Sequence, residues 1–328
     1  MSSFTFTEVV RLAQVGTSGR GRGVLGALAS LPGADIVVLC EEDESALSAA
    51  SRAFPEARAT TRSETVAADA AVDAVVLSHG DVDVARGCLE ASKHVLIRPA
   101  AAPPDAIRQL ADLAAERDVR LMVAHTLRYH PAVRATEDLV ADGELGTVRT
   151  VTWHLGDYGG PATDAVLDEH APSALSVVQA LIGGAPRAVS AQAQSAQGSA
   201  DVVLIAVQFE DGALADLHLS RIEARTVRHL TVAGSRGLAF FDGLDLREQL
   251  RLYTNPDADE APARPGSDVH VPRLSNEDPM RLLCQEFVAS IRERRAPRTD
   301  GADGLAVAML LEAARASIEA GGRRIELA

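Results

Sequence analysis

Three glycines near the N-terminus, Gly16, Gly19 and Gly21, have the spacing of a turn that binds a pyrophosphate. An apolar run at 9–15 precedes the turn, and a run with helical periodicity at 24–31 follows it. A strand, a glycine turn and a helix in this order present backbone N–H groups to a pyrophosphate. The sequence therefore predicts a dinucleotide site at this turn.

Ser18 stands where such a turn usually has its second glycine, and we expect Ser18 and Arg20 to bind the cofactor together with the glycines. Glu41 follows a second apolar run at 35–40. It lies about 20 residues after the last glycine, where a dinucleotide site places the acceptor for its ribose 2′-hydroxyl. No Arg or Lys between Glu41 and Ser51 could neutralise a 2′-phosphate. The pattern predicts NAD as the cofactor, in preference to NADP.

The composition excludes several classes of partner. The chain has 328 residues, 47% of them hydrophobic and 24% charged, and its net charge is −14, which argues against nucleic acid and anionic lipid. No apolar run reaches the roughly 18 residues of a membrane span. The first residues lack the pattern of a secretory signal, and the three cysteines lack the spacing of metal ligands. We expect a cytoplasmic protein that acts on a small molecule and has no metal.

The first part of the chain alternates short apolar strands with helices. This alternation is typical of parallel βαβ units, so residues 1–125 are predicted to form an α/β Rossmann domain with a doubly wound parallel sheet. The expected strands are 9–16, 34–40, 57–60, 73–78, 94–97 and 120–124, and the expected helices are 23–31, 43–53, 63–70, 82–92 and 104–117.

Residues 126–328 are predicted to form an α+β domain with a large, mostly antiparallel sheet. Its expected strands are 147–155, 187–194, 201–209, 213–220, 227–233, 237–241, 248–253 and 324–327; its expected helices are 131–141, 170–182, 278–294 and 303–320, with loops at 156–168 and 255–275. Asp211-Gly212 is a hairpin signal. The outward positions of strands such as 201–207 include many apolar residues, so we expect this sheet to form a homodimer or homotetramer interface.

The order of several short motifs along the whole chain resembles the Gfo/Idh/MocA family, named for glucose–fructose oxidoreductase, inositol dehydrogenase and rhizopine catabolism. The resemblance implies a Rossmann domain, a sheet domain with oligomer contacts, and hydride transfer between a nicotinamide and a sugar or cyclitol carbinol. The motifs are the glycine turn at 16–21, Cys40-Glu41, Lys93-His94-Val95-Leu96, Leu127-Arg128-Tyr129-His130-Pro131, Gly143-Glu144-Leu145-Gly146, and Phe209-Glu210-Asp211-Gly212-Ala213.

The chain departs from the family at the residues that would move protons. The family usually has Glu-Lys-Pro after the fifth strand, and its lysine helps to move the substrate proton; here the segment is Ile97-Arg98-Pro99. Arginine does not deprotonate in proteins, so Arg98 cannot be that relay. Lys93, the single lysine of the chain, would lie roughly 16 Å away along the strand. We expect Arg98 to contact the cofactor and to stabilise a substrate oxyanion; neutral drift from lysine is the alternative.

Two further family motifs are altered. The family usually has Thr-Pro-Asn after the fourth strand; here that segment reads Val76-Leu77-Ser78-His79, of which Ser78 is an expected cofactor contact. The family places Asp four residues before a catalytic His; here His170 is present, but Val166 stands at that spacing. His170 is the expected acid/base, because imidazole titrates near neutral pH. The alternative is a helix-start histidine bonded to Asp168 or to backbone.

Five further residues are candidates for substrate contact, because they lie near the motifs above and carry polar groups. They are Arg128, Tyr129, His154, Tyr158 and Asp168. Two functions remain open. One is an NAD-dependent oxidoreductase in which Arg98 replaces the usual lysine. The other is a family member without redox turnover, either a lyase, isomerase or cyclase, or a ligand-sensing protein.

Overall fold

The computed structural model describes residues 9–99, 102–158, 166–195, 200–245, 247–254 and 268–327. The chain forms two compact units, unit 1 from Met1–Tyr129 with Glu277–Ala308, and unit 2 from His130–Asn276 with Met309–Ala328. The first boundary lies four residues beyond the expected one, and a later segment returns to unit 1. The sequence did not indicate this return, because the segment's helices carry no mark of which sheet they cover.

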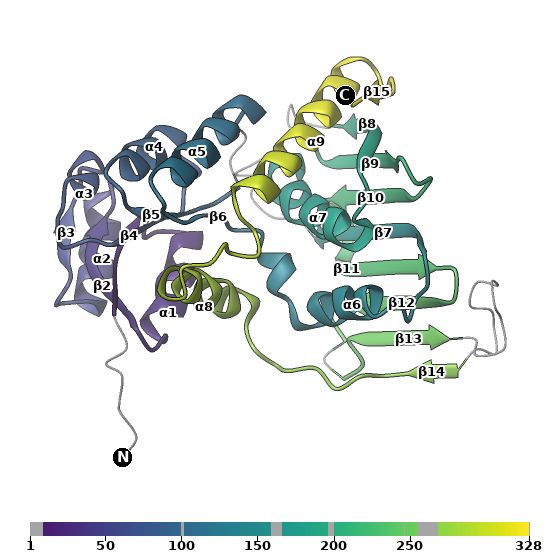
Figure 1. Cartoon of the computed structure of the whole chain (residues 1–328), viewed down its shortest axis with the longest axis horizontal. Helices are drawn as coiled ribbons and strands as arrows, with labels where there is room; N and C mark the ends of the chain where they lie inside the picture. The colour runs from purple at the N-terminus through teal and green to yellow at the C-terminus, as the bar shows by residue number, and fades with distance from the viewer. Residues whose placement is uncertain are drawn as a thin grey trace. The chain divides into compact units, whose positions relative to one another are not determined.

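Unit 1 is built on a six-stranded parallel sheet in the order β3-β2-β1-β4-β5-β6 (Figure 1). This is the strand order of the doubly wound Rossmann fold, as predicted. The strands are β1 (Val10–Val15), β2 (Ala34–Cys40), β3 (Arg58–Thr60), β4 (Ala74–Leu77), β5 (His94–Ile97) and β6 (Leu121–Val123). The helices are α1 (Arg20–Ala29), α2 (Glu44–Ala53), α3 (Glu64–Ala67), α4 (Val82–Glu90), α5 (Pro104–Glu116), η1 (Thr126–Tyr129) and α8 (Pro279–Arg292).

The central strands are apolar on both faces because each face packs against its own hydrophobic cluster. In β4, Val76 belongs to one cluster, and its neighbours Val75 and Leu77 belong to the other. The cluster that contains Val76 also contains Leu28 of α1 and Phe287 of α8. This packing explains why α8, late in the sequence, is part of unit 1.

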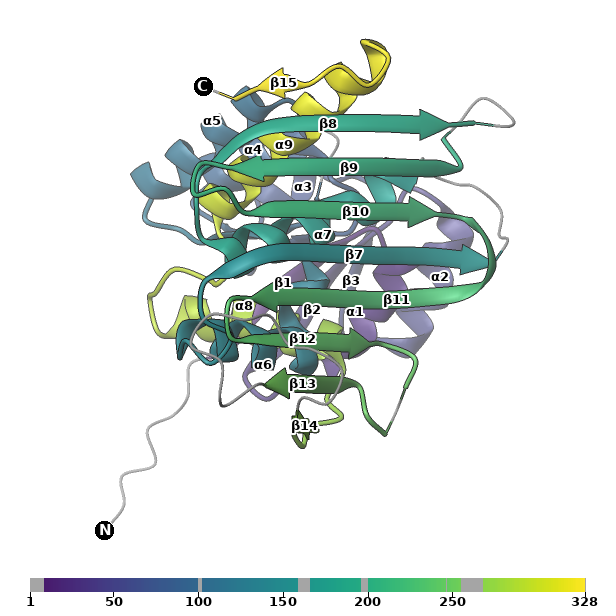
Figure 2. The ribbon, with the colours of Figure 1, turned by 90° about the vertical axis from the view of Figure 1, so that its right-hand side faces the viewer.

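Unit 2 contains a nine-stranded sheet in the order β14-β13-β12-β11-β7-β10-β9-β8-β15 (Figure 2). The strands are β7 (Val148–Tyr158), β8 (Pro186–Gln194), β9 (Val202–Phe209), β10 (Leu214–Ser220), β11 (Ile222–Gly234), β12 (Gly237–Asp242), β13 (Leu250–Thr254), β14 (Asp268–His270) and β15 (Ile325–Glu326). Only β10 and β7 pair in parallel among the strand pairs of this sheet that the structure describes. The sheet is mostly antiparallel, as predicted.

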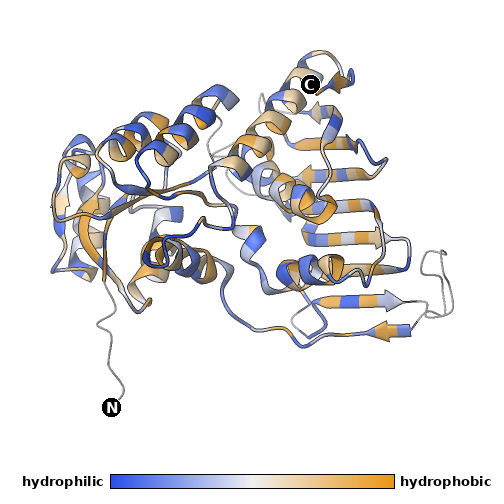
Figure 3. Cartoon of the chain, viewed as in Figure 1, coloured by the Kyte–Doolittle hydropathy of each residue, from blue (hydrophilic) through white to orange (hydrophobic). Residues whose placement is uncertain are grey.

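The two faces of this sheet differ in polarity because side chains alternate along each strand. Helices α6 (Pro131–Ala141), α7 (Val166–Ile182) and the later part of α9 (Gly301–Glu319) lie on one face, behind the sheet in Figure 2. Trp153 and Leu217 point to that side and are fully buried. We call the opposite face the open face; it carries Thr152, His154, Leu204, Asp216, His218 and His229. Figure 3 shows the alternation as bands along the strands.

Three expectations about unit 2 are corrected. Helix α7 begins at Val166 rather than His170, because Asp168 and Glu169 occupy its first turn, where the helix dipole favours acidic residues. Strand β7 continues to Tyr158 beyond the expected end at 155. The expected loop at 255–275 contains β14, while 255–267 lie outside the described residues. Among the described residues, no helix is long and apolar enough to cross a membrane.

Candidate active site

The glycine turn between β1 and α1 adopts a conformation that depends on its glycines. Gly16 and Gly19 have φ angles of +84° and +53°, in the region that residues with a side chain rarely adopt. A Cβ placed on Gly21 would lie 2.1 Å from the carbonyl oxygen of Gly16. The turn and the first turn of α1 are thus packed backbone against backbone, which only glycine permits at position 21.

The residues around this turn fit a pyrophosphate. Gly19 is the N-cap of α1, no described side chain caps it, and the first turn of the helix contains no acidic residue. Beneath the turn, the buried Gln14 donates from Nε2 to the carbonyl oxygens of Gly16 (3.0 Å) and Gly21 (2.6 Å). Those carbonyls are held inward, and the positive end of the helix is left for an anion. Arg20, an expected contact, is exposed as the first residue of α1.

Glu41 follows β2 and reaches back to the glycine turn. Its Oε2 accepts hydrogen bonds from the backbone N–H of Thr17 (2.8 Å) and of Ser18 (3.0 Å) and from Thr17 Oγ1 (3.3 Å). Burial by itself would raise the pKa of Glu41, but these hydrogen bonds outweigh it and the pKa is lowered. Glu41 is therefore an ionised residue that organises the turn. Its contact with a ribose remains a prediction.

Two residues after β4 support the turn from the side. Ser78 is buried, and its Oγ lies 3.3 Å from Nε2 of Gln14. The ring of the exposed His79 lies against Gly16, because a Cβ on Gly16 would come within 2.5 Å of the His79 ring atoms. His79 was not predicted to belong to this site. The one available signal was its position in the segment that replaces Thr-Pro-Asn.

Arg98 lies at the carboxyl end of β5, as its place in the sequence indicates. Its backbone N–H donates to the carbonyl of Leu77 at the end of β4 (3.0 Å), and its side chain is half-buried. Lys93 precedes β5, and its Nζ donates to the carbonyls of Asp69 (3.0 Å) and Val72 (2.7 Å). The prediction that Lys93 lies at the opposite end of the strand is confirmed, so it cannot replace Arg98.

Two predicted substrate residues belong to the interior of unit 1. Tyr129 is only 2% exposed, and its hydroxyl lies 3.0 Å from Thr299 Oγ1. Arg128 is buried, and its Nη1 donates to Asp303 Oδ1 at the start of α9 (3.0 Å). The assignment of Tyr129 to substrate contact was wrong, because its ring is part of the hydrophobic core. Arg128 holds the end of η1 to α9 through Asp303.

In unit 2, a chain of charged groups ends at His170. The Nε2 atom of His170 in α7 lies 3.2 Å from Oδ2 of Asp157 in β7. The other oxygen of Asp157 accepts from Nη2 of Arg228 in β11 (2.6 Å), and Arg228 Nη1 donates to the carbonyl of Gly156 (2.8 Å). Arg228 thus fixes Asp157, and Asp157 orients the imidazole of His170.

Asp157 places a carboxylate beside His170, although the residue four positions before His170 in the sequence is Val166. The spacing of the family motif points to Val166 in α7, which is buried. Asp157 comes instead from a strand, where alternation puts it on the same side as Trp153 and faces it toward α7. The alternation of side chains along β7 was the signal in the sequence that could have identified Asp157. Asp164 lies outside the described residues.

The remaining substrate candidates do not gather around His170. Asp168 forms an ion pair with Arg315 of α9, and His170 lies beside Asp157. The structure therefore does not describe the pair of His170 and Asp168 that was the alternative to a catalytic role. His154 has the opposite strand parity to Asp157 and lies on the open face, away from α7. His154 therefore does not lie beside His170, and its contact with a substrate stays a prediction. The side chain of Tyr158 lies outside the described residues.

Comparison with known proteins agrees with this architecture. Residues 10–125 match a family model described as the oxidoreductase family with an NAD-binding Rossmann fold, and residues 133–240 match the GFO/IDH/MocA C-terminal domain. The chain is 26% identical to D-apiose dehydrogenase of Paraburkholderia graminis, over 99% of this chain and 92% of that protein. It is also 29% identical to an uncharacterized oxidoreductase, ORF334, of Rhizobium meliloti, over 44% of this chain and 45%, less than half, of that protein.

Solved structures share the fold over nearly the whole chain. Levoglucosan dehydrogenase in complex with NADH and levoglucosan superposes with a TM-score of 0.86 at 17% identity, over 97% of this chain and 99% of that one. GenD2 from gentamicin A biosynthesis in complex with NAD gives a TM-score of 0.82 at 25% identity, over 98% and 97%. Together with the two family matches, this shows that the chain belongs to the Gfo/Idh/MocA family of oxidoreductases, with an NAD-binding Rossmann domain and the family's C-terminal domain.

Proposed function

We propose that this protein is an NAD-dependent dehydrogenase that transfers a hydride between the nicotinamide and a carbinol or ketone of a sugar, cyclitol or related small polar metabolite. The observation that carries the proposal is the chain from Arg228 through Asp157 to His170. It supplies an oriented acid/base in a family that otherwise depends on a lysine this chain lacks. The names of the relatives, D-apiose dehydrogenase and levoglucosan dehydrogenase, support the substrate class.

Unit 1 supplies the cofactor site in this proposal. The glycine turn and the start of α1 hold the pyrophosphate, and the carboxylate of Glu41 binds a ribose hydroxyl. Because Glu41 is ionised, it repels a 2′-phosphate, which favours NAD over NADP. When bound, NAD supplies the hydride acceptor.

His170 moves the proton of the substrate oxygen. Asp157 lies beside Nε2 and orients the ring, and we assign the proton exchange with the substrate to the imidazole of His170. A carboxylate on one ring nitrogen orients the imidazole and stabilises its protonated form, as in other acid/base dyads. Arg98 stays charged, and in this role it stabilises negative charge that develops on the substrate oxygen.

Arg98 also supports the second candidate, a family member without redox turnover. A guanidinium in place of the lysine suits a site that binds a carboxylate or carbonyl and never removes a hydroxyl proton there. A lyase, isomerase or cyclase, or a ligand-sensing protein, would use such a site. Cofactor binding and turnover separate the two candidates.

The test begins with titration of NADH and NADPH into the purified protein, followed by fluorescence, and continues with NADH formation across a panel of sugars and cyclitols. We expect tighter binding of NADH and turnover of at least one polyol. Tighter NADPH binding would contradict the role of Glu41, and binding of neither would favour the non-redox candidate.

Variants then test the acid/base. His170→Gln is expected to lower kcat by about 10²–10⁴-fold, the range for a positioned acid/base, with little change in NADH affinity. Asp157→Asn should lower kcat in the same direction while KM stays nearly constant. Asp168→Asn is the matched control, because it removes a neighbouring carboxylate that pairs with Arg315. An active His170→Gln enzyme would place the proton transfer elsewhere.

A further inference from the structure

Three histidines form a row across adjacent strands of the open face. In the register of the sheet, His218 of β10 pairs with His154 of β7, and His154 pairs with His229 of β11. The rings of His154 and His218 are stacked, with centroids 4.4 Å apart and planes 13° apart. The stacking brings the two imidazoles close enough to share one neighbouring group.

Glu223, near the start of β11, brings a carboxylate to both stacked rings. Its Oε1 lies 3.1 Å from Nε2 of His154 and 3.6 Å from Nε2 of His218. One potential ligand atom from each of the three residues lies within 4.8 Å of the other two. Two imidazole nitrogens and a carboxylate oxygen therefore lie close together.

The backbone makes room for this convergence at Gly156. A Cβ on Gly156 would lie 2.3 Å from Cγ of Glu223. The Glu223 side chain therefore lies against Gly156, in the space that a larger residue would occupy. Any larger residue at position 156 would push the carboxylate away from the histidines. The site is thus built from four strand positions rather than from flexible surface side chains.

The separations between Glu223 and each of the two histidines fit a tetrahedral metal ion. Zinc binds His nitrogen and carboxylate oxygen at about 2.0–2.2 Å, which puts neighbouring ligand atoms about 3.3 Å apart. The observed 3.1 and 3.6 Å lie on either side of that value. We propose that His154, His218 and Glu223 bind a divalent transition-metal ion, with zinc the best match, and that water completes its coordination.

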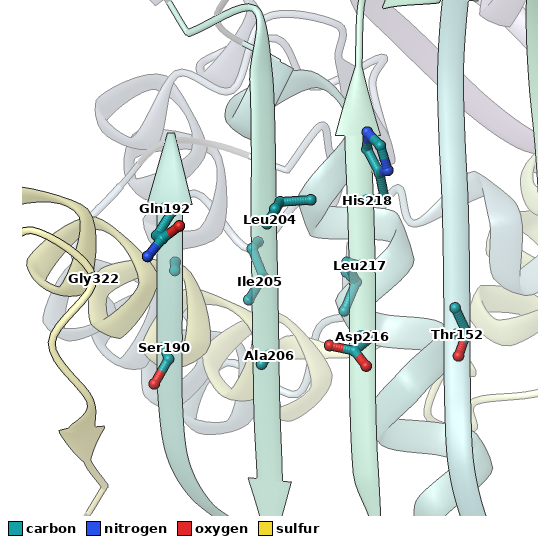
Figure 4. A pocket seen from close by; sticks show the side chains of 11 residues that line it. Thr152, Ser190, Gln192, Leu204, Ile205, Ala206, Asp216, Leu217, His218 and Gly322 are labelled. Atoms are coloured by element: carbon teal, nitrogen blue, oxygen red, sulfur yellow. The ribbon is translucent and has the colours of Figure 1, made fainter. Parts of the chain in front are cut away.

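The surroundings permit an ion to enter. The side chains of His154, His218 and Glu223 are 33%, 42% and 24% exposed. A groove of about 330 Å³ on the open face reaches His218, whose ring is drawn at the carboxyl end of β10 (Figure 4).

His229 is not part of the proposed ligand set. Its Nε2 lies 3.3 Å from Oδ2 of Asp242, and its ring centroid is 6.5 Å from that of His154 in an edge-on orientation. His229 shares the open face and the row with the other two, and it already has a carboxylate partner. It is therefore the matched control for a histidine that merely lies near the site.

The test uses the full chain without an affinity tag, freed of metal by chelation and dialysis. Zn²⁺ is titrated by isothermal calorimetry, and Co²⁺ is titrated by visible absorption, which reports tetrahedral nitrogen and oxygen ligation. We expect one ion per chain. His154→Ala, His218→Ala and Glu223→Gln should each weaken Zn²⁺ binding by more than about tenfold, since even loss of an outer partner typically costs 10–100-fold.

His229→Gln should bind Zn²⁺ within about twofold of the unchanged protein, below the 1.4 kcal/mol that a tenfold change represents. The cysteines do not compete, because burial raises the pKa of Cys40 and Cys88 to about 11 and that of Cys284 to about 12. The proposal is overturned if the unchanged chain binds no Zn²⁺. It is also overturned if the three ligand variants bind as well as the unchanged chain, or if His229→Gln loses as much affinity as they do. Circular dichroism of each metal-free variant verifies that it is folded.

Discussion

Replacing Gly21 by alanine tests the description of the glycine turn more directly than any substitution at a charged residue. Alanine is a better helix former than glycine, so in an open helix this change stabilises by up to about 1 kcal/mol. At position 21 the new Cβ would lie 2.1 Å from the carbonyl oxygen of Gly16, more than 1 Å inside the 3.4 Å at which ordinary contact begins. Because the contact is with a backbone atom, no side-chain rotation relieves it, and the backbone of the turn must shift.

The size of the effect follows from comparison within one helix. Gly26 also lies in α1, and a Cβ there would meet nothing within 4 Å. Both substitutions gain helix propensity by a similar amount, so this gain largely cancels when the free energies of unfolding of Gly21→Ala and Gly26→Ala are compared. The remaining difference is the cost of the clash at position 21. Overpacking of this kind typically costs about 1–3 kcal/mol, so Gly21→Ala should be less stable than Gly26→Ala by that amount.

Thermal unfolding and NADH titration measure the two variants. A unit of this size shifts by about 2–4 °C per kcal/mol, so the unfolding midpoints should differ by about 2–12 °C. Movement of Gly16 also disturbs the hydrogen bonds of Gln14 and Glu41, and NADH affinity should fall at least about tenfold in Gly21→Ala. Gly26→Ala should keep its affinity. If both variants are stabilised alike and bind NADH alike, the turn is not packed as described.

Three further predictions concern other parts of the chain. Glu41→Gln should lower the unfolding midpoint at pH 7, and the difference should shrink as the pH falls below the ordinary Glu pKa of 4.5, because a lowered pKa stabilises the fold only while the carboxylate is ionised; a difference that is constant with pH would refute the role of its charge. Arg98→Lys should weaken ligand binding if the guanidinium is used as a fork, whereas a gain in NADH formation on polyols would indicate drift from an ancestral lysine. Sedimentation should give a dimer or tetramer through the open face, where Leu204, Leu214 and Ile222 are exposed, and a monomer at micromolar concentration would refute this.

The sequence predicted the elements whose local signals were strong. Strand β5 and helix α6 have the predicted bounds, because a short apolar run and a proline at the first helical position mark them without reference to the rest of the chain. The parallel sheet of the Rossmann domain followed in the same way from the βαβ alternation. The glycine turn and Glu41 were found because their spacing in sequence reflects one local motif.

What could not be predicted depends on pairs that are distant in sequence. Asp157 meets His170 only because β7 and α7 pack together, and the search along the helix found Val166 instead. His154 was placed with the substrate residues because neighbours in sequence were assumed to be neighbours in space. On a strand, adjacent residues point to opposite faces. Tyr129 was misjudged because a hydroxyl suggested a ligand contact, while Thr299 in the interior satisfies it.

The return of Glu277–Ala308 to unit 1 has a consequence for synthesis of the chain on the ribosome. Leu283, Cys284 and Phe287 of α8 are fully buried in the same cluster as Leu25 and Leu28 of α1. When residue 129 has been made, this side of the nucleotide-binding fold still lacks its cover, and about 150 residues must follow before the cover is made. An N-terminal fragment cut where the first domain was expected to end would therefore expose an apolar groove. During translation the same surface has to be shielded or remain loose until the last helices emerge.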